Sequence, residues 1–186
     1  MLSSCLTPST EPASTTSDAL LSLYRDPQFR PLVQEYFTDL TANAAVANAI
    51  LVTADALDMN PSLAFAVAWN ESRFNPRAVN WNRSTVDRGL FQLNSRTFAH
   101  LKRATVFDPV SNARQGLTYL KRALDRLGSE EKALGYYNAG IGLLTDRELP
   151  QSTKLYVKKV LDDRDSIDHD AIASIYFGHG VRLALR

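Results

Sequence analysis

Residues 60–76 read NPSLAFAVAWNESRFNP, and the rest of the chain is best understood outward from them. Asn60 followed by Pro61 is a typical helix start, because asparagine caps the first backbone amides and proline lacks only an N–H that has no helical partner there. Nearly every side chain that follows is small or apolar. This pattern predicts a helix that is buried on most of its faces.

Glu71 is the one acidic residue of that helix, and it lies on the apolar face. It stands seven residues after Ala64, on the stripe that also carries Val67 and Ala68. Burial disfavours the charged form of a carboxyl, and the negative end of the helix dipole acts in the same direction. A carboxyl with a raised pKa can act as a general acid near neutral pH. The alternative is a solvated surface glutamate, the usual state of this residue on a helix.

Helical periodicity and helix-end signals continue on both sides of this segment, whereas residues 75–95 are rich in turn formers. We therefore predict an all-α fold with a long loop or a small β-hairpin at 75–95. The other segments expected to be helical are 19–25, 28–40, 43–59, 108–127, 130–138, 150–163 and 168–177.

The composition indicates one soluble-type globular domain. The chain has 186 residues, of which 45% are hydrophobic and 22% charged, with 21 Lys+Arg against 20 Asp+Glu. A formal net charge of +1 argues against a strongly basic nucleic-acid-binding protein. The three histidines have no metal-ligand spacing, so we expect neither a metal nor another cofactor.

The N-terminal residues 1–18 differ in composition from the helical domain expected over 19–186. They hold five Ser, four Thr and two Pro, which predicts a flexible tether. Leu2-Ser3-Ser4-Cys5 resembles the bacterial lipobox, in which the cysteine is lipidated after signal cleavage. A charged and apolar signal does not precede it, so the match is either fortuitous or belongs to a lipoprotein whose signal was trimmed or whose start was placed too late. The lone Cys5 also excludes an intrachain disulfide.

Five sequence blocks in a fixed order carry a family resemblance that covers about residues 50–165. The blocks are Glu71-Ser72 with Phe74-Asn75-Pro76; Gly89-Leu90-Phe91-Gln92; Asp108-Pro109 with Asn112, Gly116, Tyr119 and Leu120; Tyr137-Asn138-Ala139-Gly140; and Pro150, Thr153, Tyr156 and Val157. In this order they resemble the bacterial lytic transglycosylase domain of the soluble, goose-lysozyme-like type.

The resemblance implies a lysozyme-like fold that cleaves the β-1,4 bond between N-acetylmuramic acid and N-acetylglucosamine in peptidoglycan. It implies 1,6-anhydromuramyl products, no cofactor, and Glu71 as the catalytic acid and base. We expect a monomer in the cell envelope or periplasm, with a membrane contact only through Cys5. The residues expected to bind substrate or to lie beside it are Ser72, Asn80, Asp87, Phe91, Gln92, Asn94, Tyr137, Asn138 and Tyr156.

Asp87 leaves the reaction open. It precedes Gly89 in a stretch similar to the hairpin of animal lysozymes, where an aspartate is the second catalytic carboxylate. If its carboxyl lies ~5–9 Å from that of Glu71, a hydrolase becomes feasible; if it points away, the single-acid transglycosylase route holds. An aspartate that only caps its own turn is the third reading. A protein that binds peptidoglycan without cleaving it is a further hypothesis, against which the presence of Glu71 argues.

Overall fold

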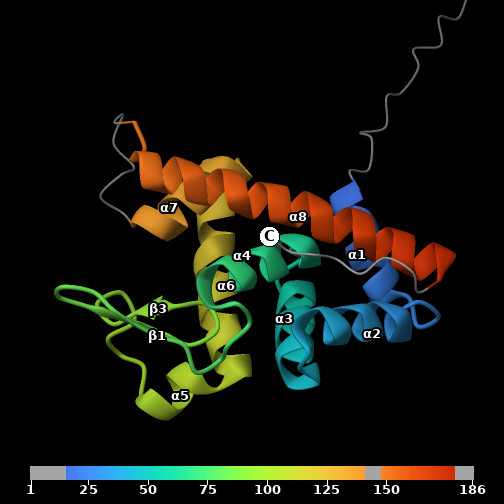
Figure 1. Ribbon diagram of the computed structural model, residues 1–186, viewed down its shortest axis with the longest axis horizontal. Coiled ribbons are helices and arrows are strands. Elements are labelled where there is room, and N and C mark those ends of the chain that lie inside the picture. The colour runs from blue at the N-terminus through green and yellow to red at the C-terminus, as the bar shows by residue number, and fades with distance from the viewer. Residues whose placement is uncertain (1–15, 141–147, 179–186) are drawn as a thin grey trace, which may run out of the picture.

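The computed structural model describes residues 16–140 and 148–178, which form a mostly helical fold with one small antiparallel sheet (Figure 1). This confirms the expected fold class. Cys5 lies outside the described residues. Within them, no helix has both the length and the apolar character needed to cross a bilayer. The elements are α1 (Thr16–Arg25), α2 (Arg30–Thr41), α3 (Ala44–Ala56), α4 (Pro61–Ser72), β1 (Val79–Trp81), β2 (Val86–Arg88), β3 (Leu93–Asn94), α5 (Arg103–Phe107), α6 (Pro109–Leu127), α7 (Glu130–Ala139) and α8 (Gln151–Phe177).

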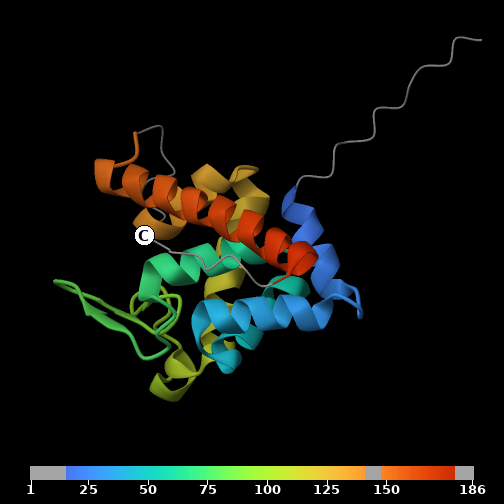
Figure 2. The same ribbon diagram turned by 45° about the vertical axis from the view of Figure 1, so that its right-hand side comes forward.

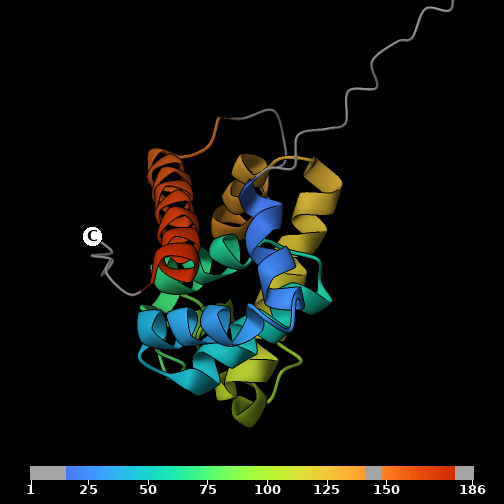
Figure 3. The same cartoon turned by 90° about the vertical axis from the view of Figure 1, so that its right-hand side faces the viewer.

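Helix α4 runs through the middle of the fold. The side chain of Asn60 caps the helix by accepting a hydrogen bond from the backbone N–H of Ser62 at 2.7 Å. Every residue from Pro61 to Ala68 is buried. Figure 3 shows α8 on one side of α4 and α6 on the other. The surrounding helices thus fix the C-terminal end of α4, where Glu71 lies.

Helix α8 corrects the sequence prediction, which divided it into two helices at 150–163 and 168–177. It is continuous over 27 residues. The acidic residues around the expected break are part of the cause, because two of them are buried against α4. Asp163 accepts a hydrogen bond from Asn70 at 2.7 Å, and Asp168 accepts one from Ser62 at 3.0 Å. Paired in this way, they hold α8 on α4 instead of ending it.

The segment 75–95 contains three strands, one more than a hairpin, in the order β1-β2-β3. The sheet extends away from the helices in Figure 2. In the antiparallel register Asn80 lies opposite Asp87, which in turn lies opposite Asn94. Because directly opposed residues share a face of a sheet, these three side chains form one polar row. The short helix α5 that follows the sheet was not expected.

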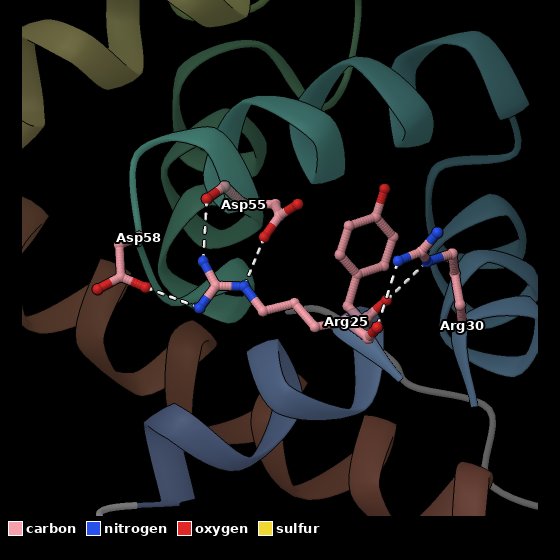
Figure 4. Close-up of polar contacts among 5 residues, drawn as sticks. Arg25, Arg30, Asp55 and Asp58 are labelled. Carbon is pink, nitrogen blue, oxygen red and sulfur yellow. Dashed lines mark hydrogen bonds and ion pairs between the residues drawn. The ribbon is translucent and has the colours of Figure 1, made fainter. Parts of the chain in front are cut away.

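The N-terminal helices are held to the rest of the fold by two arginines (Figure 4). Arg25 of α1 forms ion pairs with Asp55 at 2.6 Å and with Asp58 at 2.9 Å, both beside the end of α3. Arg30 donates to the backbone carbonyls of Tyr24 and Arg25, at the end of α1. Helix α1 begins at Thr16, so the last three residues of the expected tether are helical, and buried Leu20 anchors the helix in the core.

Candidate active site

Glu71 lies at the end of α4, partly buried beneath α8. The next residue but one, Arg73, has a left-handed backbone (φ 55°), which ends the helix. Tyr156 of α8 donates its hydroxyl hydrogen to Glu71 Oε1 at 2.6 Å. The glutamate and the late tyrosine of the sequence blocks are therefore in direct contact.

The surroundings of Glu71 raise its pKa to about 7. Burial of the carboxyl is the largest cause, and the negative charge of Asp87 acts in the same direction. The hydrogen bond from Tyr156 opposes both by stabilising the carboxylate. Near neutral pH this carboxyl is therefore populated in both protonation states, and it can donate a proton and then accept one.

Asp87 is held in the sheet by a side-chain amide on each of its oxygens. Asn94 Nδ2 donates to its Oδ1 at 2.7 Å, and Asn82 Nδ2 donates to its Oδ2 at 2.6 Å. Asn80 lies opposite Asp87 in the strand register, and its Nδ2 donates to Asn82 Oδ1 at 3.4 Å. Asn82 was not among the residues predicted to form the site. Its position five residues before Asp87, across a hairpin turn, is the only signal that the sequence offered.

Phe91 and Tyr137 join the sheet segment to the helices. The side chain of Phe91 is fully buried. It packs against α6, where a Cβ added to Gly116 would lie 2.5 Å from the Cβ of Phe91. The Phe91 carbonyl accepts a hydrogen bond from the Tyr137 hydroxyl at 2.8 Å. Burial, and then the charge of Glu71, raise the pKa of Tyr137, which keeps its phenol protonated.

The remaining predicted residues are placed by local hydrogen bonds. Gln92 has a left-handed backbone (φ 46°) and folds its side chain back, so that Nε2 donates to the Gly89 carbonyl at 2.8 Å. Buried Ser72 donates to the Ala68 carbonyl at 3.2 Å, within the last turn of α4. Asn138 accepts from Thr153 at 3.0 Å, which links α7 to the start of α8.

A pocket of about 450 Å³ is lined by residues of the sheet segment, α6 and α7, and Glu71 is not part of its wall. Tyr137 connects the pocket with Glu71, because it lines the pocket and the charge of Glu71 raises its pKa. Sequence reasoning missed Arg96 and Phe98 as wall residues, because no motif surrounds them. The lining residues are Thr85, Phe91, Gln92, Leu93, Asn94, Arg96, Thr97, Phe98, Tyr119, Tyr137, Asn138, Ala139 and Gly140.

Aromatic rings form one side of this pocket. The ring of Tyr119 stacks on that of Tyr136 at 5.3 Å between centroids and meets those of Phe98 and Tyr137 edge-on at 5.7 and 5.8 Å. Amides and phenols with flat apolar faces suit a ligand rich in hydroxyl and acetamido groups. In the part of the chain that the structure describes, no three potential metal ligands gather into a cluster.

The fold agrees with the sequence comparisons. The transglycosylase SLT domain family matches residues 48–159, and the chain belongs to this family. Among curated relatives, an X polypeptide of Escherichia coli is 34% identical over 107 residues, which cover 50% of this chain and 63% of the relative. The invasion protein IagB of Salmonella typhimurium (strain SL1344) is 29% identical over 131 residues, which cover 67% of this chain and 79% of the relative. The chain thus spans less than two thirds of the X polypeptide.

Proposed function

We propose that the protein is a lytic transglycosylase that cleaves the β-1,4 bond between N-acetylmuramic acid and N-acetylglucosamine of peptidoglycan. The observation that supports this proposal most directly is the state of Glu71 at the end of a buried helix. The pKa of its carboxyl is raised to about 7, and the carboxyl accepts a hydrogen bond from Tyr156. Membership of the transglycosylase SLT domain family supports the same substrate class.

In the first step, protonated Glu71 donates its proton to the glycosidic oxygen. The bond between that oxygen and C1 of the muramic acid then breaks, and positive charge develops at C1. The negative charge of Asp87 acts on Glu71, and it is suited to stabilise the charge at C1 as well.

In the second step, Glu71 is a carboxylate and accepts the proton of the C6 hydroxyl. The C6 oxygen bonds to C1 and closes the 1,6-anhydro ring, so no water is consumed. The hydrogen bond from Tyr156 favours the carboxylate form in this interval, because a donor on the charged oxygen stabilises it. One residue thereby acts as acid and then as base.

A hydrolase of the same bond is the second candidate, and the setting of Asp87 favours it. Its two oxygens are held by Asn82 and Asn94, and its charge acts on Glu71. A fixed carboxylate near the acid is the arrangement of retaining glycosidases, in which the second carboxylate attacks C1 or stabilises it while water completes the reaction.

Digestion of purified peptidoglycan with mass spectrometry of the products tests both candidates. We expect anhydro ends, which are lighter than reducing ends by one water; reducing ends would instead establish the hydrolase.

Glu71→Gln is expected to lower the rate by roughly 10²–10⁴-fold, the range of general acid–base contributions. The matched control is Glu131→Gln at an exposed position of α7. Unchanged activity of the Glu71 variant would refute the assignment, and binding without any soluble product would favour a non-catalytic role.

We further propose that the protein works in the cell envelope, where peptidoglycan lies, and that Cys5 is lipidated. The basis is the family together with the lipobox-like Leu2-Ser3-Ser4-Cys5. Mass spectrometry of the protein isolated from its native cells is expected to find acyl groups on Cys5. A mature chain that begins at another residue, or an unmodified cysteine, would contradict the anchor and leave the proposed activity untouched.

A further inference from the structure

Positive charge is concentrated in the segment that bears the sheet. Residues 73–96 contain five arginines and one aspartate, a net charge of +4, so the remainder of this +1 chain carries a net −3. The near-neutral total therefore conceals a strongly basic segment next to Glu71. The arginines are Arg73, Arg77, Arg83, Arg88 and Arg96.

These arginines are not neutralised by the protein itself. Within residues 16–140 and 148–178, none of the ion pairs involves them. The single acid of the segment, Asp87, takes its hydrogen bonds from two asparagine amides. Arg73 instead lies over the ring of Trp69 at 4.3 Å. The segment is therefore open to an external anion.

Arg96 brings this charge into the pocket. Arg96 lines the cavity together with Asn94 and Thr97, and every other lining residue is uncharged. Two contacts hold it there: its backbone N–H donates to Asn94 Oδ1 at 3.0 Å, and its Nη2 donates to Ser84 Oγ at 3.3 Å. Serine satisfies only one of the five guanidinium N–H donors. The others can make a paired contact with a ligand.

We propose that Arg96 binds a carboxylate of the peptidoglycan strand, so that the pocket recognises the peptide attached to muramic acid as well as the sugar. This inference rests on the proposed function for its substrate class. The glycan backbone itself is uncharged. The anions of the strand are the free carboxylates of the peptide or, where the peptide has been removed, the lactyl carboxylate of the muramic acid. A guanidinium matches the two oxygens of either group in a bidentate hydrogen bond.

Three forms of one peptidoglycan preparation test the proposal. The first keeps its peptides, the second has them removed by an amidase and bears free lactyl carboxylates, and the third keeps its peptides with their carboxylates converted to amides. The variants are Arg96→Gln and Arg96→Lys. The lysine variant keeps the positive charge but lacks the paired N–H groups of the guanidinium. Arg77→Gln removes the same charge from the basic segment outside the pocket wall. Arg96 is exposed, and melting temperatures verify that its variants are folded.

Arg96→Gln is expected to lower kcat/KM about 10-fold or more on the peptide-bearing form and to have little effect on the amidated form, as for the loss of a charge-assisted hydrogen bond. Arg96→Lys should recover part of the loss, and Arg77→Gln should lose less than Arg96→Gln. A loss confined to the amidase-treated form would identify the lactyl carboxylate as the bound group and would refute recognition of the peptide. Equal losses on all three forms, or none on any, would overturn the proposal.

Binding separates this proposal from the reaction. Co-sedimentation of the wild-type protein and of Arg96→Gln with the three insoluble forms needs no turnover. If the wild type cleaves none of them, the proposed function fails. A weaker binding of Arg96→Gln to the carboxylate-bearing forms alone would still establish the carboxylate site, and indistinguishable binding would refute it.

Discussion

Helix α4 and the three-stranded sheet supply the two carboxylates of the site by opposite means. From Pro61 to Ala68 the helix is buried, and Glu71 at its end is partly withdrawn from water. In the sheet Trp81 is 77% exposed, and the two oxygens of Asp87 are held by hydrogen bonds from the side-chain amides of Asn82 and Asn94. Burial governs the carboxyl of Glu71, whereas hydrogen bonds from side-chain amides position that of Asp87. Two carboxyl groups can therefore belong to one candidate site while different physical interactions govern each.

The largest expected effect on stability comes from removing the charge at the buried end of α4. The pKa of Glu71 is about 7 in the folded protein and near 4.5 in the unfolded protein. The free energy of unfolding therefore falls as the pH rises from about 4.5 to 7, because the carboxyl ionises more readily in the unfolded chain. Glu71→Gln should therefore stabilise the protein by up to about 3 kcal/mol at pH 8, with the gain vanishing below about pH 4. Urea unfolding at both pH values measures it. A gain independent of pH would contradict a desolvated carboxyl.

A second substitution disturbs the contact that joins the sheet segment to α6. Gly116→Ala places a Cβ 2.5 Å from that of buried Phe91, whose carbonyl accepts the Tyr137 hydrogen bond. Overpacking is expected to destabilise the fold by about 1–3 kcal/mol. Arg114→Ala on the exposed face of α6 serves as the control and should change stability by less than about 0.5 kcal/mol. Thermal unfolding that is the same for both variants would mean that the contact is not tight.

Tyr156→Phe sharpens the comparison from the helical side. Loss of the donor to Glu71 removes the contribution that lowers its pKa, so the pH at which activity falls on the alkaline side should move upward. Pre-steady-state or initial-rate pH profiles measure this shift. Tyr176→Phe, at an exposed position near the end of α8, is the control and should leave the profile in place. A downward shift would mean that Tyr156 does not stabilise the carboxylate.

Asp87→Asn should give the opposite and smallest shift. It removes a charge that raises the pKa of Glu71, so the alkaline limb of the profile should move downward. Because Asp87 is the least of the three influences on Glu71, we expect less displacement than from Tyr156→Phe. The same direction of shift in both variants would show that the two regions do not act on Glu71 in opposition.

The sequence could predict those features that neighbouring residues determine. Asn60 and Pro61 mark the start of α4 locally, and its apolar composition predicts that most of this helix is buried. The contacts of Asp87 with Asn82 and Asn94 depend on strand register, which turn-forming residues do not specify. The burial of Phe91 depends on Gly116 in another element. Likewise, the continuity of α8 through its acidic segment depends on distant partners in α4 that no local pattern reveals.

Helix α8 also sets which genetic changes the protein can tolerate. Its Tyr156, Asp163 and Asp168 contact Glu71, Asn70 and Ser62 of α4, so a single rigid helix fixes three positions along another. Inserting or deleting one residue between Tyr156 and Asp163 turns one end of α8 by about 100° and moves it about 1.5 Å against the other. The chain could then keep the contacts with α4 on only one side of the inserted or deleted residue. Substitutions on the outer face should accumulate in this helix during evolution, whereas its length between these residues should stay constant.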